Sequence, residues 1–190
     1  MVKKLKPTIQ EAGQLKHIEK TCMSNEDINK YLPNCKIVSY NELPKYTSIF
    51  QLLPHNKSYV IILYQQSENS GHWVALLRYN NTIEYFDSLG NAPDVPLKWN
   101  SPEQNLSLGI NDKYLSNLLA KSKMRIIYNP IKYQEQNNEI STCGAHAVLR
   151  IQTMLKGYDL AQYYEIMKKA KKEMGVNFDE IAAGLINKRS

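Results

Sequence analysis

The sequence has few cysteines, and their number and spacing exclude two classes of protein. Its 190 residues include Cys22, Cys35 and Cys143 and no other cysteine. An odd, widely spaced set argues against a disulfide scaffold. It also argues against a zinc-type site, which needs closer spacings such as Cys-x-x-Cys. We therefore expect a reduced protein without a metal or another cofactor.

The sequence also lacks long apolar stretches and internal repeats. No apolar run approaches the roughly 20 residues that span a bilayer. The basic N-terminal residues 1–7 lack the apolar core of a signal peptide. We therefore expect an intracellular protein that does not contact a membrane.

What is present indicates an ordinary globular chain. Hydrophobic residues make up 43% and charged residues 22% of the sequence, and 190 residues suit one domain with its own core. The formal net charge of +6 weakly favours acidic partners, including nucleic acid. The basic run at residues 168–172 is read as the solvated face of a helix, with contact to a polyanion as the alternative.

The distribution of elements predicts an α+β fold in a single domain over residues 1–190. Residues 1–55 read as mostly helical, with a helix that starts at Ser24 and ends at Pro33. Residues 58–155 read as the catalytic core, and residues 158–190 as C-terminal helices. The predicted strands cover residues 58–64, 72–79, 82–86 and 124–128. The predicted helices cover residues 112–123, 144–156, 160–173 and 178–187, and residues 88–111 read as a long loop.

Cys143 is the candidate nucleophile. It lies where a polar loop meets a predicted helix, and the free N–H groups and dipole of a helix N-terminus stabilise a thiolate. Gly144 follows it and allows close backbone packing. A lone cysteine is more often a buried structural residue. Here the flanking signals favour a catalytic thiol, whereas Cys22 and Cys35 lack such a context.

His72 is the candidate base, and Asp87 is the carboxylate that would orient it. His72 begins one predicted strand, and Asp87 follows the next strand 15 residues later. Because residues 80–81 form a tight turn, the start of the first strand and the end of the second lie side by side. Nucleophile, base and orienting acid together indicate a cysteine hydrolase, most simply a protease.

Three other histidines compete for the role of base. His146 lies three residues after Cys143 on the same predicted helix. Side chains on one helix surface point outward together, whereas a base should approach from across a cleft. We therefore interpret His146 as a packing or hydrogen-bonded residue. His17 and His55 are expected at the surface.

The oxyanion donors and the substrate contact complete the candidate site. The Cys143 N–H is one donor, and a loop glutamine is the other. Gln134, which directly follows a strand, is slightly favoured over Gln136, which is closer to Cys143. Trp73 is either a core tryptophan or the roof of a narrow channel that admits only glycine-like residues. Trp99 reads as a surface residue or a lid anchor.

Three motifs in a fixed order resemble a known family. They are Gly71-His72-Trp73, Phe86-Asp87-Ser88-Leu89-Gly90, and Gln134 followed by Thr142-Cys143-Gly144. Together they resemble the adenovirus maturation protease and its cellular relatives, the SUMO-specific proteases. The resemblance covers about residues 58–155. The short chain is similar to the viral branch, especially the proteases of virophages and Polinton-like elements.

The resemblance implies a small mixed sheet between helices, distantly like papain with the catalytic order permuted. His72 would be the base, Asp87 its partner, Cys143 the nucleophile, and a glutamine the oxyanion donor. Trp73 matches the tryptophan that follows the family histidine. Gln136 fits the family spacing to the cysteine and Gln134 fits the strand end, so the choice between them stays open.

The resemblance also implies substrate, partners and location. Cleavage would fall next to glycines in capsid or core protein precursors, in the virion or the host cytoplasm. The substrate is a protein, and the enzyme is expected to be a monomer. The adenovirus enzyme is helped by DNA, and the basic charge here is compatible with DNA as an activator. Asp87 stands where the adenovirus enzyme carries a glutamate and is more similar to the cellular branch.

Four functions compete on these residues. The first is an endopeptidase that matures viral structural proteins by His-Asp-Cys catalysis. The second, with the same chemistry, removes ubiquitin-like modifiers. The third is an acyl transferase that passes the thioester to an amine. The fourth is a DNA-binding structural protein, which would require the convergence of the three roles to be a coincidence.

Overall fold

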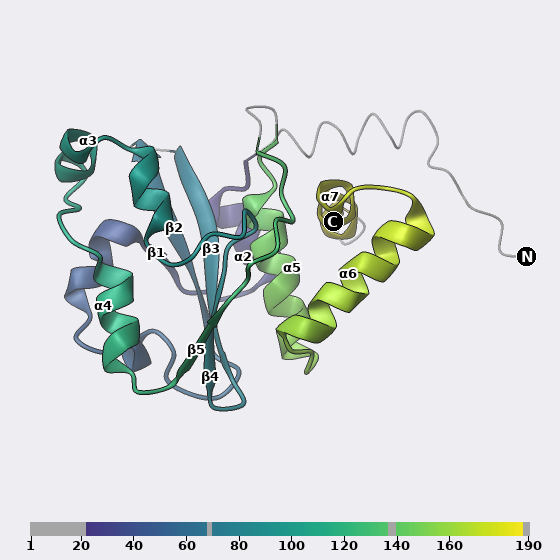
Figure 1. The fold of residues 1–190 in the computed structure, drawn as a ribbon, viewed down its shortest axis with the longest axis horizontal. Coiled ribbons are helices and arrows are strands. Elements are labelled where there is room, and N and C mark those ends of the chain that lie inside the picture. The colour runs from purple at the N-terminus through teal and green to yellow at the C-terminus, as the bar shows by residue number, and fades with distance from the viewer. Residues whose placement is uncertain (1–21, 68–69, 137–139, 188–190) are drawn as a thin grey trace, which may run out of the picture.

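One mixed sheet with helices on both faces forms the protein (Figure 1). The fold comes from a computed structural model that describes residues 22–67, 70–136 and 140–187. The strands lie in the order β1 (Ile37–Ser39), β2 (Tyr59–Ser67), β3 (Ser70–Tyr79), β4 (Thr82–Phe86) and β5 (Arg125–Tyr128). The two outer pairs are parallel, and the two inner pairs are antiparallel. This arrangement confirms the predicted α+β class.

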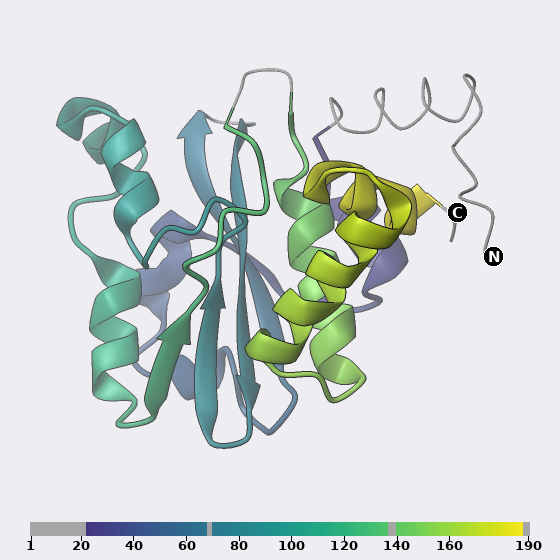
Figure 2. The ribbon, with the colours of Figure 1, turned by 45° about the vertical axis from the view of Figure 1, so that its right-hand side comes forward.

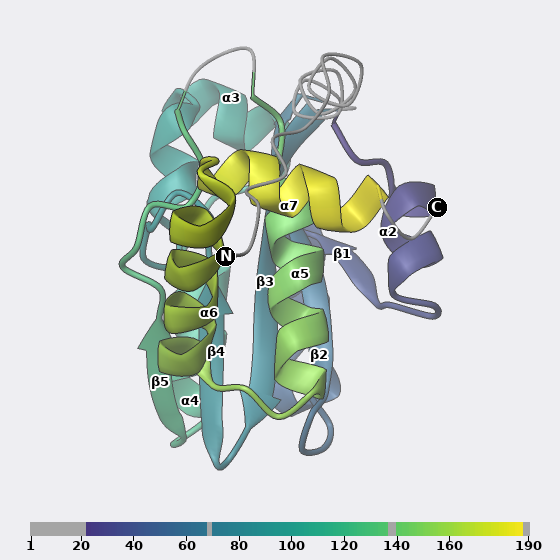
Figure 3. The ribbon, with the colours of Figure 1, turned by 90° about the vertical axis from the view of Figure 1, so that its right-hand side faces the viewer.

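Helices cover the two faces of the sheet unequally (Figure 2). On one face α5 (Cys143–Leu155) packs along β3, α6 (Leu160–Met174) lies beside it, and α7 (Phe178–Asn187) crosses near the start of α5 (Figure 3). A short helix, α2 (Asn25–Tyr31), also contacts α5. The other face carries α4 (Tyr114–Lys121) with the 3-10 helices η1 (Tyr40–Lys45) and η2 (Ile49–Gln51).

The central strand β3 serves both cores, which explains its nearly continuous apolar sequence. Trp73, Ala75 and Leu77 belong to the core under α5. Val74 and Leu76 belong to the core under α4. Successive strand side chains point to opposite faces, so a strand that is buried on both faces needs apolar residues at every position.

A two-residue turn sets the register of the β3–β4 hairpin. Asn80 and Asn81 have φ values of 47° and 57°. Asparagine tolerates this left-handed conformation, which the favoured two-residue hairpin turns require. The resulting register pairs Ala75 with Phe86. His72 and Asp87 therefore both lie just beyond the paired part of the hairpin, at the same end of the sheet.

One expectation about the irregular regions was wrong. Residues 88–111 are not one long loop, because they contain η3 (Val95–Trp99) and α3 (Pro102–Ser107). Ser101 caps α3, and Pro102 at its first position is a helix-start signal that the sequence did carry. Residues 22–55 contain α2, η1 and η2, and also β1, which at three residues is too short for a periodic pattern. Residues 1–21 lie outside the described part of the chain.

A buried ion pair ties α5 to the sheet. The Arg150 guanidinium donates from Nε to Glu84 Oε1 at 2.7 Å and from Nη2 to Glu84 Oε2 at 2.8 Å. Both side chains are fully buried, and the Tyr79 hydroxyl donates to the same carboxylate. The bidentate geometry offsets the cost of removing both charges from water.

We predict that Arg150→Met lowers the free energy of unfolding by about 3–5 kcal/mol, because it leaves the Glu84 carboxylate buried without its partner. Urea denaturation followed by circular dichroism measures the change. The double variant Arg150→Met/Glu84→Leu removes both charges and should recover most of the loss. Equal stability of Arg150→Met and the wild type would contradict this account.

Candidate active site

Cys143 is the first residue of α5, and its sulfur is surrounded by donors. Thr142 occupies the N-cap position, and the Cys143 side chain is buried. The backbone N–H groups of Trp73 and Gly144 both hydrogen-bond to the sulfur. The start of a helix therefore presents N–H groups to this thiol, as the sequence predicted.

His72 bridges Cys143 and Asp87. Its Nε2 lies 2.7 Å from Asp87 Oδ1, and the carboxylate accepts the imidazole N–H. The imidazole also hydrogen-bonds to the Cys143 thiol, and the bond to Asp87 leaves Nδ1 for this contact. The His72 side chain is buried. The structure thus brings the three predicted residues together in one chain of hydrogen bonds.

Asp87 is held by more than His72. Its Oδ1 also accepts the Leu89 N–H at 2.8 Å, and its Oδ2 accepts the side-chain amide of Asn91 at 3.0 Å. The Asn129 side chain donates to the Asp87 carbonyl oxygen at 2.7 Å. A fully buried carboxylate with this many donors has one orientation available. It can therefore fix both the tautomer and the tilt of the imidazole.

The electrostatics of the site favour a charged pair. Burial by itself raises the pKa of Cys143. Its hydrogen bond to His72 and the charge of His72 outweigh burial and hold that pKa below its usual value. Burial likewise lowers the pKa of His72, but its bonds to Asp87 and Cys143 raise it to about 10. These contacts therefore favour a thiolate beside an imidazolium over two neutral groups.

Trp73 forms a wall beside the nucleophile. Its indole N–H donates to the Met23 carbonyl oxygen at 3.0 Å, and its ring is mostly buried. Met23 also packs against Gly144, where an added Cβ would come within 2.9 Å of the Met23 Cβ. Only glycine fits behind Cys143 at this close approach. The core interpretation of Trp73 is confirmed by its burial, and its substrate contact stays a prediction.

Trp99 lies against the imidazole, which the sequence did not reveal. Its ring centroid is 5.1 Å from that of His72, at an interplanar angle of 74°. Asn100, the next residue, donates to the Gln65 carbonyl oxygen at 2.9 Å and fixes this segment to the end of β2. The interpretation of Trp99 as a surface or lid residue therefore missed its position over the base. No local signal connected the two residues.

The two candidate glutamines differ in environment. Gln134 is buried, accepts the Ser88 hydroxyl at 2.8 Å, and donates to the Ile140 carbonyl oxygen at 3.3 Å. Gln136 is exposed. The bonds of Gln134 make it rigid but occupy one of its two N–H groups. The assignment of the oxyanion donor therefore stays a prediction.

The remaining histidines and cysteines lie as follows. His146 is fully buried, and its Nε2 lies 3.0 Å from Asp179 Oδ1. This confirms the interpretation of His146 as a hydrogen-bonded residue. His55 is exposed as expected, and His17 lies outside the described residues. Cys35 is buried, and burial raises the pKa of its thiol to about 11.

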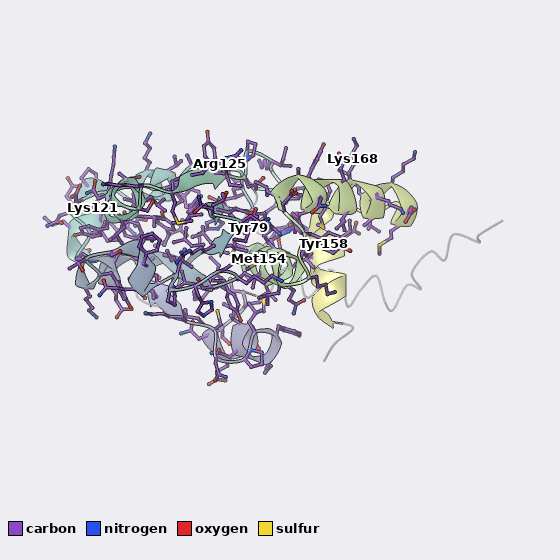
Figure 4. All side chains as sticks on the ribbon, turned by 90° about the horizontal axis from the view of Figure 1, so that it is seen from below. Tyr79, Lys121, Arg125, Met154, Tyr158 and Lys168 are labelled. Carbon is purple, nitrogen blue, oxygen red and sulfur yellow. The ribbon has the colours of Figure 1, made fainter. Side chains whose placement is uncertain are left out.

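A cavity lies along β5, and its wall reaches from Arg125 to Asn129, which bonds to Asp87. It has a volume of about 540 Å³ and lies between β5 and the start of α6, with Tyr79, Arg125 and Leu160 in its wall. Figure 4 views the molecule from below, with Tyr79 and Arg125 of this wall labelled. Within the described ranges, no cluster of three or more His, Cys, Asp or Glu side chains could hold a metal ion. Among the same residues, no helix is long and apolar enough to cross a membrane.

We predict that iodoacetamide alkylates Cys143 faster than an ordinary thiol below pH 9, because its lowered pKa increases the thiolate fraction there. The rate should fall in acid as the thiolate gains a proton. His72→Ala should slow labelling at pH 7 by removing the main contact that lowers this pKa. Peptide mass mapping of labelled protein gives the rate at each cysteine.

Cys35 is the internal control for this experiment. Its thiol, with a pKa of about 11, should stay unlabelled at pH 7. Cys143→Ser removes the fast site and shows whether the signal comes from Cys143. If Cys143 reacts no faster than Cys35 at pH 7, the charged pair described above is wrong.

Comparison with known proteins gives the site a family context. The model of the Ulp1 protease family, C-terminal catalytic domain, matches residues 52–185. An uncharacterized protein of Sputnik virophage is 37% identical over 153 residues, which cover 79% of this chain and 85% of that protein.

Solved structures of two proteases are more distantly similar. A protease of ASFV has 13% identity and a TM-score of 0.46, and the match covers 86% of this chain and 67% of that one. The Ulp1 protease domain in complex with the yeast SUMO orthologue has 16% identity and a TM-score of 0.40, over 93% of this chain and 82% of that one. Likenesses at this level carry no conclusion about substrate. The match over residues 52–185 does identify the family, and the chain belongs to the Ulp1 protease family of cysteine peptidases.

Proposed function

We propose that this peptidase is an endopeptidase that cleaves next to glycines in viral capsid or structural protein precursors during virion maturation. The observation that carries the proposal is the position of His72, which bonds to both Cys143 and Asp87. Thiol, imidazole and carboxylate are the three groups that nucleophilic acyl transfer requires.

In the proposed reaction, the Cys143 thiolate attacks the carbonyl carbon of the scissile peptide bond. The resulting tetrahedral intermediate collapses, and the His72 imidazolium gives its proton to the departing amine. A water molecule then attacks the thioester while His72 accepts a proton from it. Collapse of this second intermediate releases the carboxyl product and returns the sulfur as a thiolate. Asp87 keeps the imidazole oriented through both steps.

Each tetrahedral intermediate carries a negative oxygen that needs fixed donors. The Cys143 N–H at the start of α5 is the proposed backbone donor. Gln134 is the proposed side-chain donor, since its buried amide is already oriented by Ser88. Gln136, which is seven residues before Cys143, is the alternative.

Cleavage next to glycine follows from the crowding around the thiol. Cys143 is almost fully buried in the same core cluster as Trp73, and the Trp99 ring lies against His72. A substrate chain that passes Trp73 has little room for a side chain beside the scissile bond. We therefore propose Trp73 as a substrate-binding residue.

The viral role is supported by the Sputnik virophage relative, at 37% identity. On this proposal the enzyme acts as a monomer in the virion or in the host cell cytoplasm. The net charge of +6 favours DNA as an activator. The role of DNA is tested by the dependence of peptide cleavage on added DNA.

Removal of ubiquitin-like modifiers is the second candidate. It is favoured by the match to the Ulp1 family over most of the chain. The chemistry and the residues would be the same, and only the substrate would differ. Release of a folded modifier from a Gly-Gly fusion, without cleavage of short peptides, would favour this function over the first.

We predict that Cys143→Ala abolishes cleavage of peptides that contain Gly-Gly or Gly-x-Gly, because it removes the nucleophile. His72→Ala should lower kcat by about three orders of magnitude or more. Asp87→Asn should cost less, because it disturbs the orientation of the base without removing it. The measurement is steady-state kinetics with and without DNA.

Folding of each variant is checked by circular dichroism. His146→Ala is the comparison, since it removes a buried imidazole on the same helix as Cys143. If a folded His146→Ala loses as much activity as His72→Ala, the assignment of His72 as the base is wrong.

We predict that the glutamine that donates to the oxyanion is identified by a drop of about 10²–10³ in kcat on substitution. Gln134→Ala and Gln136→Ala are compared under the same conditions. On the proposed assignment Gln134→Ala gives the large loss and Gln136→Ala a small one. The reverse order would transfer the role to Gln136, and small losses in both would remove the side-chain donor from the mechanism.

A further inference from the structure

A buried carboxylate on α7 collects three hydrogen bonds from around the nucleophile. Asp179 is fully buried. It accepts the N–H of Glu135 at 2.9 Å, the hydroxyl of Thr142, and the Nε2–H of His146 at 3.0 Å. None of these contacts is needed for the proposed reaction between Cys143, His72 and Asp87. They need a separate explanation.

The partners of Asp179 lie at positions that matter for the oxyanion. Thr142 occupies the N-cap position of α5 and directly precedes Cys143. Glu135 lies between Gln134 and Gln136, the two candidate side-chain donors. The Asp179 carboxylate therefore joins Thr142, next to the nucleophile, to Glu135, next to both glutamines. Gln134 also donates to the carbonyl oxygen of Ile140, which lies two residues before Thr142. This bond too joins the glutamine side to the start of α5.

We propose that Asp179 is a positioning residue, which holds the glutamine-bearing segment against the start of α5 so that the oxyanion donors have a fixed separation. The inference rests on the proposed function and deepens it. It does not depend on which glutamine donates, because Glu135 adjoins both. It also gives the C-terminal helix α7 a role in the active site.

The hydrogen bonds to the Asp179 carboxylate are charge-assisted and limit the movement of their donors. Burial by itself raises the pKa of Asp179, but its bonds to His146, Thr142 and the Glu135 N–H hold that pKa below its usual value. Charge-assisted hydrogen bonds are short and directional. Donors of an oxyanion must be fixed to within a fraction of an ångström, because small displacements lose most of their effect.

Packing alone does not account for this arrangement. An apolar residue of similar volume in place of a buried carboxylate is often neutral or stabilising, provided that its partners are also replaced. A purely structural Asp179 would therefore affect unfolding but not the kinetic constants of folded protein. A positioning Asp179 would affect kcat in folded protein, and this difference can be measured.

The test is Asp179→Asn, which keeps the shape of the side chain but loses its charge and one acceptor oxygen. We expect kcat for a Gly-Gly peptide to fall about 10- to 100-fold, with KM changed by less than about threefold. Alkylation of Cys143 by iodoacetamide should stay within about twofold of wild type, because this displacement develops no oxyanion. A folded variant with unchanged kcat, or one whose alkylation falls as much as its kcat, overturns the proposal.

Matched variants separate positioning from loss of stability. Glu180→Gln changes the neighbouring carboxylate, which accepts the Asn177 N–H at the start of α7, and it should leave kcat unchanged. Thr142→Val removes one hydroxyl bond to Asp179 and should lower kcat, whereas Thr142→Ser keeps the hydroxyl and should restore it. This pair decides the question if Asp179→Asn does not fold. Equal kcat in the two Thr142 variants would then overturn the proposal.

The failure of the proposed function has a different signature. If wild-type protein cleaves no glycine-containing peptide, the endopeptidase proposal fails whatever the variants do. The restraint that Asp179 places on the segment with the two glutamines is then measured by amide hydrogen exchange. Asp179→Asn should speed exchange of the Glu135 amide, while exchange rates of amides in the middle of α6 stay unchanged. If Asp179→Asn does not fold, Thr142→Val is used in its place. Unchanged exchange at Glu135 overturns the inference without reference to turnover.

Discussion

A buried imidazole between a thiol and a carboxylate is the constraint on which the rest of the structure depends. Burial alone would drive His72 and Cys143 toward their neutral forms. The charged pair persists only while His72 keeps both partners at hydrogen-bonding distance. Asp87 enters from the end of β4, and Cys143 enters from the start of α5. The relative position of β4 and α5 therefore decides whether the charged pair can form.

The fold meets this constraint with contacts at the start and in the middle of α5. At the first turn, Gly144 allows Met23 to pack closely, and the N–H of Trp73 meets the Cys143 sulfur. Two turns later, Arg150 joins the helix to Glu84 on β4, the strand that also delivers Asp87. The helix is thus fixed to the strand that carries its own electrostatic partner. A shift of α5 along the sheet would break the ion pair and the active-site contacts together.

The parts of this protein that the sequence revealed are those with local signals. The β3–β4 hairpin could be predicted from its apolar strands and its Asn80-Asn81 turn. The register set by this turn places His72 near Asp87. Cys143 follows from its loop-to-helix context. Trp99 and Asp179 reach the site from distant segments and carry no pattern in their own neighbourhoods. The choice between Gln134 and Gln136 could not be predicted, because it depends on the direction of one amide within an irregular segment.

The near-complete burial of the proposed nucleophile also concerns the substrates. Cys143 is only 6% exposed and lies in the same core cluster as Trp73. A bond within a folded domain cannot be brought to such a sulfur without unfolding that domain. An extended strand without bulky side chains can reach it. On the proposed endopeptidase function, selection would therefore operate on the state of the target chain as well as on its sequence: flexible tethers between domains would be cut, and the domains themselves would survive intact.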